Sequence, residues 1–92
     1  MDINKLKVKA RSLTNDLIYA EPGAERTKHA AKRTRQVHIY KSTEKDAENG
    51  YTYKVIITDL EGSQYDYEDS IPEDVLYDTL FDRFCRLEAL VE

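Results

Sequence analysis

Carboxylates recur at regular intervals in the second half of the chain. Asp66 and Glu68 alternate within a segment expected to be a strand, so their side chains share one face about 6–7 Å apart. Asp74, Asp78 and Asp82 recur at helical spacing, which sets them in a stripe with about 6 Å between neighbours. Both intervals approximate the phosphate spacing along one nucleic-acid strand. The residues expected to form such a phosphate-like ridge are Asp59, Glu61, Asp66, Glu68, Asp69, Asp74 and Asp78.

Tyrosines accompany these carboxylates. The chain has seven tyrosines and no tryptophan, and neighbouring predicted strands carry Tyr51, Tyr53, Tyr65 and Tyr67. Tyrosine is enriched at protein interfaces because it combines a large ring with a hydroxyl group. We expect Tyr65 and Tyr67 to share one strand face, opposite Asp66 and Glu68, and to join the ridge in a partner-binding surface. The alternative is that the carboxylates only keep the domain soluble and that two tyrosines cover the core.

The first half of the chain is basic. Up to Thr43 there are ten Lys/Arg against four Asp/Glu, a net charge of +6, whereas the remainder carries four against fourteen, a net charge of −10. Such asymmetry indicates a charged partner, or a homodimer that pairs its own halves. The residues of an alternative, nucleic-acid-binding surface are Arg26, Lys28, Lys32, Arg33 and Arg35.

Side chains that could support catalysis or metal binding are sparse. The lone Cys85 follows Phe84 in an amphipathic segment, where a small buried thiol is the expected state. His29 and His38 have no sequence-adjacent carboxylate to orient them. The acidic turns lack EF-hand spacing, and the three glycines suit turns rather than a phosphate-binding loop. We therefore expect no enzyme, no metal and no cofactor.

The chain of 92 residues predicts a single α+β domain, residues 1–92, with one thin core. Asp2 can cap a helix whose apolar positions step by three and four: Ile3, Leu6, Ala10, Leu13 and Leu17. Alternation from Lys5 to Arg11 also fits a strand, but the continuation to Leu17 favours a helix. Pro22 and Gly23 end it. For residues 22–35 the expected state is a short exposed helix or a mobile basic loop.

A three-stranded antiparallel sheet is expected next. Val37 and Ile39 alternate with polar residues, Asn49-Gly50 predicts a turn, and the β-branched run from Tyr51 to Leu60 is the clearest strand. Glu61-Gly62 turns the chain into a strand over residues 63–69. Ser70 and Glu73 have capping-box spacing, so a C-terminal amphipathic helix is expected to begin there. Its predicted buried face comprises Leu76, Leu80, Phe84, Leu87 and Val91, helped by Val75, Phe81 and Leu90.

The location expected from the sequence is the cytoplasm, with no membrane contact. One cysteine cannot form an internal disulfide, which fits a reducing compartment. No apolar run approaches the roughly 20 residues that span a bilayer, and the first residues are too polar for a signal peptide.

Several short segments resemble those of the small phage-encoded anti-CRISPR proteins that inhibit the type II RNA-guided nuclease. The opening Met1 to Leu6 is similar to the start of one such family. So is the later order of an apolar strand, a Gly62 turn, a tyrosine strand that enters acidic residues, and an amphipathic helix. The residues that carry this likeness are Val55, Ile56, Ile57, Tyr65, Glu68, Asp69, Phe81 and Phe84.

This resemblance implies a DNA mimic with one helix, three antiparallel strands and a further helix. The matching acidic positions would be Asp66, Glu68 and Asp69. The hairpin and helix also resemble a phage inhibitor of uracil-DNA glycosylase, another DNA mimic. The basic stretch from Pro22 to Arg35 has no counterpart in the anti-CRISPR family, and the chain lacks a further acidic tail.

The helix, three-strand, helix order is also that of double-stranded-RNA-binding domains. Those domains present a basic start to their second helix, whereas this chain has Glu73-Asp74 and Asp78. The preferred hypothesis is therefore an inhibitor that binds a host nucleic-acid-binding defence protein or nuclease through its acidic, tyrosine-rich surface. The alternatives are a nucleic-acid-binding regulator that uses residues 26–35 and a homodimer.

Overall fold

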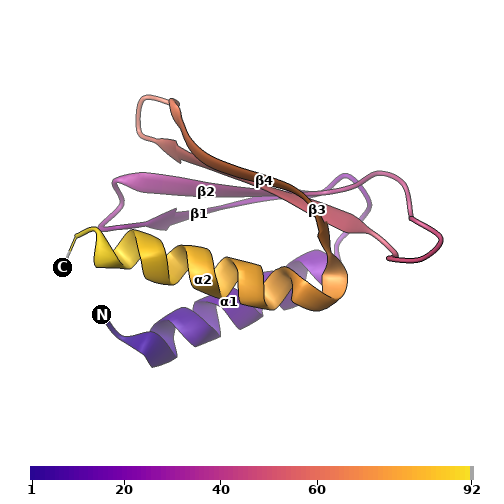
Figure 1. Ribbon diagram of the computed structural model, residues 1–92, viewed down its shortest axis with the longest axis horizontal. Coiled ribbons are helices and arrows are strands. Elements are labelled where there is room, and N and C mark those ends of the chain that lie inside the picture. The colour runs from indigo at the N-terminus through magenta and orange to yellow at the C-terminus, as the bar shows by residue number, and fades with distance from the viewer. Residues whose placement is uncertain (92) are drawn as a thin grey trace.

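Two helices lie on one face of a four-stranded antiparallel sheet in the computed structural model, which describes residues 1–91 (Figure 1). The elements follow in the order α1 (Ile3–Ile18), β1 (Glu25–Ala30), β2 (Arg35–Lys41), β3 (Thr52–Asp59), β4 (Gln64–Pro72), the 3-10 helix η1 (Glu73–Val75) and α2 (Leu76–Ala89). The strands form a meander in which sequence neighbours pair, so β1 and β4 are the two edges. The α+β class and the two terminal helices are confirmed.

The prediction of three strands is wrong because residues 25–30 form a fourth. Neither of the expected states for this segment, an exposed helix or a mobile loop, is found. β1 pairs antiparallel with β2, and Lys28 lies opposite Val37. The turn between these strands holds three consecutive residues with left-handed backbone: Ala31, Lys32 and Arg33. Ala30 and Ala31 are buried, which explains the small side chains at this end of the hairpin.

The first helix forms as its spacing predicts. The Asp2 carboxylate accepts a hydrogen bond from the Lys5 backbone N–H, which satisfies one donor at the helix start. Leu6, Ala10, Leu13 and Leu17 are buried, whereas Ile3 remains exposed. The helix ends at Ile18 before the turn that contains Gly23, whose φ of +81° suits glycine.

The second helix starts later than its capping-box signal predicts. The backbone stays extended through Pro72, because Ile71 is buried and pairs with Tyr53 across the sheet. Neither η1 nor α2 has a side-chain cap at its start. Ser70 instead has a left-handed backbone with φ of +56°, and Glu73 accepts a hydrogen bond from the Tyr53 hydroxyl at 3.1 Å. The expected Ser70–Glu73 capping box is therefore absent.

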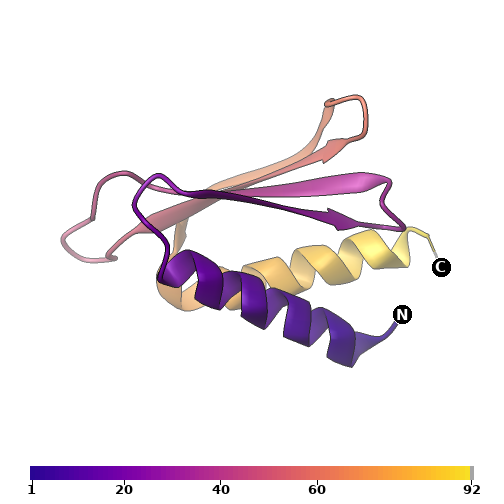
Figure 2. The same ribbon diagram turned by 180° about the vertical axis from the view of Figure 1, so that it is seen from behind.

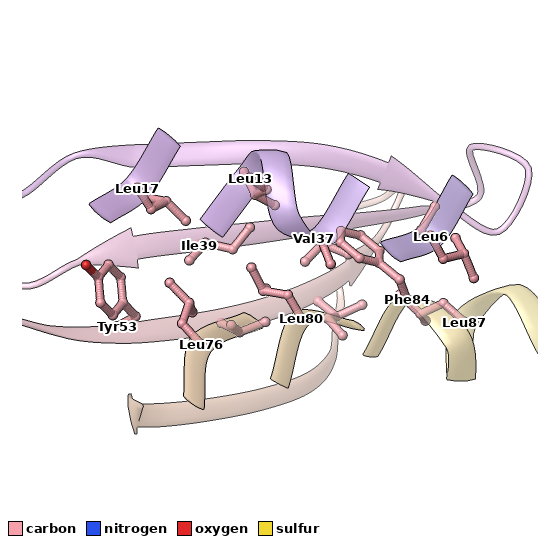
Figure 3. Packing of buried hydrophobic residues seen from close by; sticks show 14 of the residues in the cluster. Leu6, Leu13, Leu17, Val37, Ile39, Tyr53, Leu76, Leu80, Phe84 and Leu87 are labelled. Carbon is pink, nitrogen blue, oxygen red and sulfur yellow. The ribbon is translucent and has the colours of Figure 1, made fainter. Parts of the chain in front are cut away.

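The core lies between the sheet and the two helices (Figure 3). Strands β2 and β3 contribute alternate residues, as the period of two requires, and α2 contributes one face with a 3.6-residue period. Leu76, Leu80, Phe84 and Leu87 are buried as predicted, and Phe81 and Val91 pack against this core while partly exposed. The prediction is wrong for Val75 and Leu90, which are exposed. The opposite face of the sheet carries no helix (Figures 1 and 2).

Among residues 1–91, one charged residue is buried. Lys41, at the end of β2, is 4% exposed, and its ammonium group donates to the carbonyl oxygens of Leu17, Ile18 and Ala20. The first two carbonyls belong to the last turn of α1 and that of Ala20 follows it. At this end of a helix backbone acceptors are in excess and the helix dipole favours a cation. Lys41 therefore fastens the end of α1 to the sheet.

Candidate functional site

The charge split of the sequence becomes a split between two sides of the molecule. β1 and β4 lie at opposite edges of the sheet. Arg26 of β1 pairs with Asp16 of α1, and Arg83 of α2 pairs with Asp66 and Glu68 of β4, while the C-terminal part of α2 also approaches β1. We call the side formed by β4, η1 and α2 the acidic flank, with Asp66, Glu68, Asp74, Asp78 and Asp82. We call the side formed by α1, β1 and the turn after it the basic flank, with Lys9, Arg26, Lys28, Lys32 and Arg33.

A single arginine organises the centre of the acidic flank. Arg83 of α2 contacts three carboxylates: its Nε lies 3.0 Å from Asp66, one terminal nitrogen lies 2.7 Å from Glu68, and the other lies 2.9 Å from Asp82. Asp82 also pairs with Arg86 at 3.0 Å. The two strand carboxylates share one face, as their spacing predicts, and this face is the one that meets α2.

The exposure of these groups is unequal. The Arg83 side chain is 16% exposed, whereas those of Asp66, Glu68 and Asp82 are 39%, 41% and 46% exposed. The guanidinium group therefore lies mostly inside, and its three carboxylates remain accessible from outside. The three carboxylates outnumber the guanidinium groups of Arg83 and Arg86, so the cluster stays anionic, and charge-assisted hydrogen bonds hold its side chains.

The other predicted ridge residues do not join this cluster. Asp59 ends β3, and its carboxylate accepts from the backbone N–H groups of Glu61 and Ser63, so it shapes the turn. Asp69 accepts from the Ser70 N–H and the Tyr67 hydroxyl. The remaining ridge residues, Glu61, Asp74 and Asp78, are exposed. The structure thus divides the predicted ridge into a turn, a cluster around Arg83, and exposed acids at the start of α2.

A β-bulge separates the two strand tyrosines. Pairing between β3 and β4 shifts between Ile57 and Thr58, and Tyr65 lines the same hollow as Asp66 and Arg83. Tyr67 pairs with Ile56 on the uncovered face. The prediction that Tyr65 and Tyr67 share a face is therefore wrong, because the extra residue in β4 resets the alternation. A hydrogen bond to Asp69 is the main cause that raises the pKa of Tyr67 above its usual value.

The basic flank retains only part of its predicted binding set. Arg26 pairs with Asp16 of α1 at 2.6 Å, and Arg35 lies over the Tyr65 ring at 4.7 Å from its centre. Lys28, Lys32 and Arg33 are exposed, and the left-handed turn carries the last two beyond the strands. The flank also gains Lys9 of α1, whose ammonium donates to the His29 carbonyl. Burial lowers the pKa of Lys9, and nearby Glu88 opposes this shift.

The uncovered face of the sheet was not predicted. The His38 ring lies between two hydroxyls, 3.1 Å from Thr27 on β1 and 3.1 Å from Thr58 on β3. Beside it, the Lys54 ammonium lies 5.1 Å from the centre of the Tyr40 ring. The sequence signal for this face was the alternation of residues 36–40, but it becomes readable only when residues 25–30 are recognised as a strand.

Comparison with protein-family models, curated proteins and solved structures finds no match for this chain. Within residues 1–91, no group of three or more His, Cys, Asp or Glu side chains is placed to hold a metal ion. Over the same residues, neither helix is long and apolar enough to cross a membrane. Burial and the charge of Asp82 raise the pKa of the Cys85 thiol, which disfavours the reactive thiolate.

Proposed function

We propose that the protein is a small, non-catalytic inhibitor that docks its acidic flank on a basic, nucleic-acid-binding surface of another protein. The observation that carries this proposal is the Arg83 cluster, in which three accessible carboxylates surround one largely covered guanidinium. Fixed side chains lose less conformational freedom when a partner binds, so they bind more favourably than mobile ones. Complementary charge also speeds the encounter.

The partner class follows from the arrangement of the charges. A protein that binds a nucleic-acid backbone presents lysines and arginines to successive phosphates. Carboxylates along β4 and at the start of α2 could bind the same lysines and arginines in place of the phosphates. We propose a host defence protein or nuclease as the partner and the cytoplasm as the location. The resemblance to phage-encoded anti-CRISPR proteins supports this choice but does not identify the target.

The test reverses two acids whose loss leaves the Arg83 cluster in place. Asp74→Lys with Asp78→Lys, which we call the α2 variant, changes one exposed residue of η1 and one exposed residue in the first turn of α2. The matched control, Glu44→Lys with Glu48→Lys, makes the same charge change on exposed residues of the β2–β3 loop. Each variant is compared with the original chain for binding to immobilised nucleic-acid-binding domains of candidate nucleases, and thermal unfolding verifies the fold.

We expect the α2 variant to weaken binding at least about tenfold, mostly through slower association, while the loop variant stays within about threefold of the original chain. Equal effects of the two variants would mean that only net charge matters. This result would contradict a defined acidic docking surface. Nuclease activity on a DNA substrate is measured in parallel. The original chain and the loop variant should inhibit the nuclease, whereas the α2 variant should leave it active.

The second candidate function is nucleic-acid binding by the basic flank. It is favoured by the exposure of Lys28, Lys32 and Arg33 near one end of the sheet. Gel-shift assays with mixed DNA and RNA at low salt distinguish the two functions. Retardation that is lost in Lys32→Glu with Arg33→Glu, but retained in the α2 variant, would support this candidate.

A further inference from the structure

A hollow of about 190 Å³ lies between β4 and the C-terminal half of α2, within the acidic flank. Its apolar surface comes from Ile57, Leu87 and Leu90, and the Tyr65 ring forms a further wall. Tyr65 is 51% exposed and Leu90 is 57% exposed, so two large side chains frame an accessible opening. Exposed apolar groups within a polar rim are typical of protein-binding sites.

Charged groups surround this apolar surface. Asp66, Arg83 and Arg86 complete the lining of the hollow. Arg83 is held by its three carboxylates, and Arg86 is anchored to Asp82 at 3.0 Å. On the sheet side, the Arg35 guanidinium stacks on Tyr65 and fixes that ring as a wall. The hollow is therefore preformed, which reduces the ordering cost when a side chain enters it.

The chemistry of the lining selects the occupant. The two arginines of the lining would repel a lysine or arginine in the hollow, although the surrounding carboxylates attract a basic partner. A carboxylate would suit the two arginines but would be repelled by Asp66, Glu68 and Asp82. An uncharged aromatic ring is repelled neither by the arginines nor by the carboxylates. It packs on leucine and isoleucine, and its face attracts guanidinium groups.

We propose that this hollow receives an aromatic side chain of the partner, with lysines or arginines on either side of that aromatic residue. The inference rests on the proposed function, since it concerns the same flank. The basic residues of the partner contact Asp66, Glu68 and Asp82, and the ring fills the space between Tyr65 and Leu90. The carboxylates speed association, and the hollow slows dissociation.

The experiment uses two capped pentapeptides, Lys-Lys-Trp-Lys-Lys and Lys-Lys-Ala-Lys-Lys, titrated into the full chain at low salt. Methyl NMR signals of Ile57, Leu87 and Leu90 report on the hollow. We expect the tryptophan peptide to shift these signals and to bind about fivefold tighter than the alanine peptide. Leu90→Ala should remove most of that preference. The control Leu60→Ala, at an exposed leucine of the β3–β4 turn, should retain it.

The outcomes separate the hollow from the acidic surface. If the two peptides bind equally, or if the tryptophan peptide shifts signals elsewhere, the assignment of the hollow is wrong. Docking by the acidic flank still stands in that case, provided that Asp74→Lys with Asp78→Lys weakens binding of the alanine peptide. If neither peptide binds at low salt, both proposals fail.

Discussion

A buried lysine is the least predictable single residue of this protein. Burial of a charge is costly unless hydrogen bonds replace its water. The Lys41 ammonium makes three such bonds to carbonyls of the turn that ends α1, and the Tyr51 ring lies 4.8 Å away. The sequence gives no signal for this role, because Lys41 and Leu17 come together only when β2 packs beside the end of α1.

Replacement of this lysine should destabilise the fold. Lys41→Met keeps most of the side-chain volume but leaves three carbonyl oxygens without their donor. We expect the free energy of unfolding to fall by about 3 kcal/mol, measured by urea denaturation. The control Lys45→Met, at an exposed loop position, should change it by less than about 0.5 kcal/mol. A small effect of Lys41→Met would show that the lysine does not hold α1.

A buried tyrosine predicts how stability depends on alkaline pH. Tyr53 is 1% exposed, and burial, reinforced by its hydrogen bond to Glu73, raises the pKa of its phenol above the usual value of 10.0. The folded state therefore keeps a proton that the unfolded chain releases above about pH 10. The stability from this group is complete below that pH and is lost as pH rises, by at most about 1.4 kcal/mol per pH unit.

Tyr53→Phe tests this prediction, because phenylalanine has no proton to release. At neutral pH the variant should be about 1 kcal/mol less stable, since it lacks the bond to Glu73. The difference should shrink or reverse by about pH 11, as measured by urea denaturation at each pH. Other tyrosines contribute equally to both proteins, so their effects cancel. Parallel stability curves would contradict the prediction.

At the scale of elements, the sequence predicted the strands that carry alternating apolar residues and missed the one that does not. Residues 36–40 and 53–57 bury every second side chain. β1 is an edge strand whose buried-side positions include Arg26 and Lys28, because α1 supplies Asp16 there instead of an apolar surface. The alternation of apolar and polar residues does not mark this strand, because the side chains on its inner face contact charged groups rather than apolar ones.

The candidate site was predictable in part for similar reasons. Alternation placed Asp66 and Glu68 on one face, but nothing in the sequence indicated that Arg83, on another element, would reach both. The bulge at Tyr65 could not be predicted either. One extra residue changes which face of the sheet the following side chains occupy, but it leaves no mark in the composition of the strand. Local signals such as the Ser70–Glu73 spacing fail where tertiary packing favours another conformation. Here Ile71 is buried and pairs with Tyr53, so the strand continues past Ser70.

The left-handed turn between β1 and β2 depends on the second helix. The Glu88 carboxylate of α2 accepts a hydrogen bond from the Ala31 N–H at 2.8 Å, at the first of three residues with positive φ. Glu88→Ala should lower the free energy of unfolding by about 1–2 kcal/mol and speed hydrogen exchange at the Ala31 amide. Glu48→Ala, at an exposed loop position, should do neither. Unchanged exchange at Ala31 would contradict this anchoring role.

At the scale of the whole molecule, the meander converts a charge split along the chain into a separation in space. Its first and last strands become opposite edges. Arg26 of β1 pairs with Asp16 of α1 at one edge, and Arg83 of α2 pairs with Asp66 of β4 at the other. Contacts between two acidic flanks or two basic flanks would oppose like charges, whereas a contact of the acidic flank of one copy with the basic flank of another brings opposite charges together. Any homodimer favoured by charge therefore pairs opposite flanks.

Strand pairing between copies is disfavoured, because both edges are already protected. Lys9 donates to the His29 carbonyl on β1, and on β4 the Tyr67 and Ser70 N–H groups donate to Asp66 and Asp69. Charged side chains that occupy edge groups hinder the addition of another strand. Self-association should therefore rest on exposed charges alone, so it should be weak and should vanish at about 0.5 M salt, as followed by sedimentation velocity.

Mixing two charge-reversed variants tests this pairing of opposite flanks. Lys28→Glu, Lys32→Glu and Arg33→Glu make the basic flank acidic, whereas Asp74→Lys with Asp78→Lys weakens the acidic flank. Each variant alone should sediment as a monomer at low salt, because its flanks then match poorly. A mixture should form a heterodimer, since each variant supplies the flank that the other lacks. If the unaltered chain is monomeric at low salt, or if the mixture does not associate, the opposite flanks do not recognise each other, and the acidic flank is left available to a different partner.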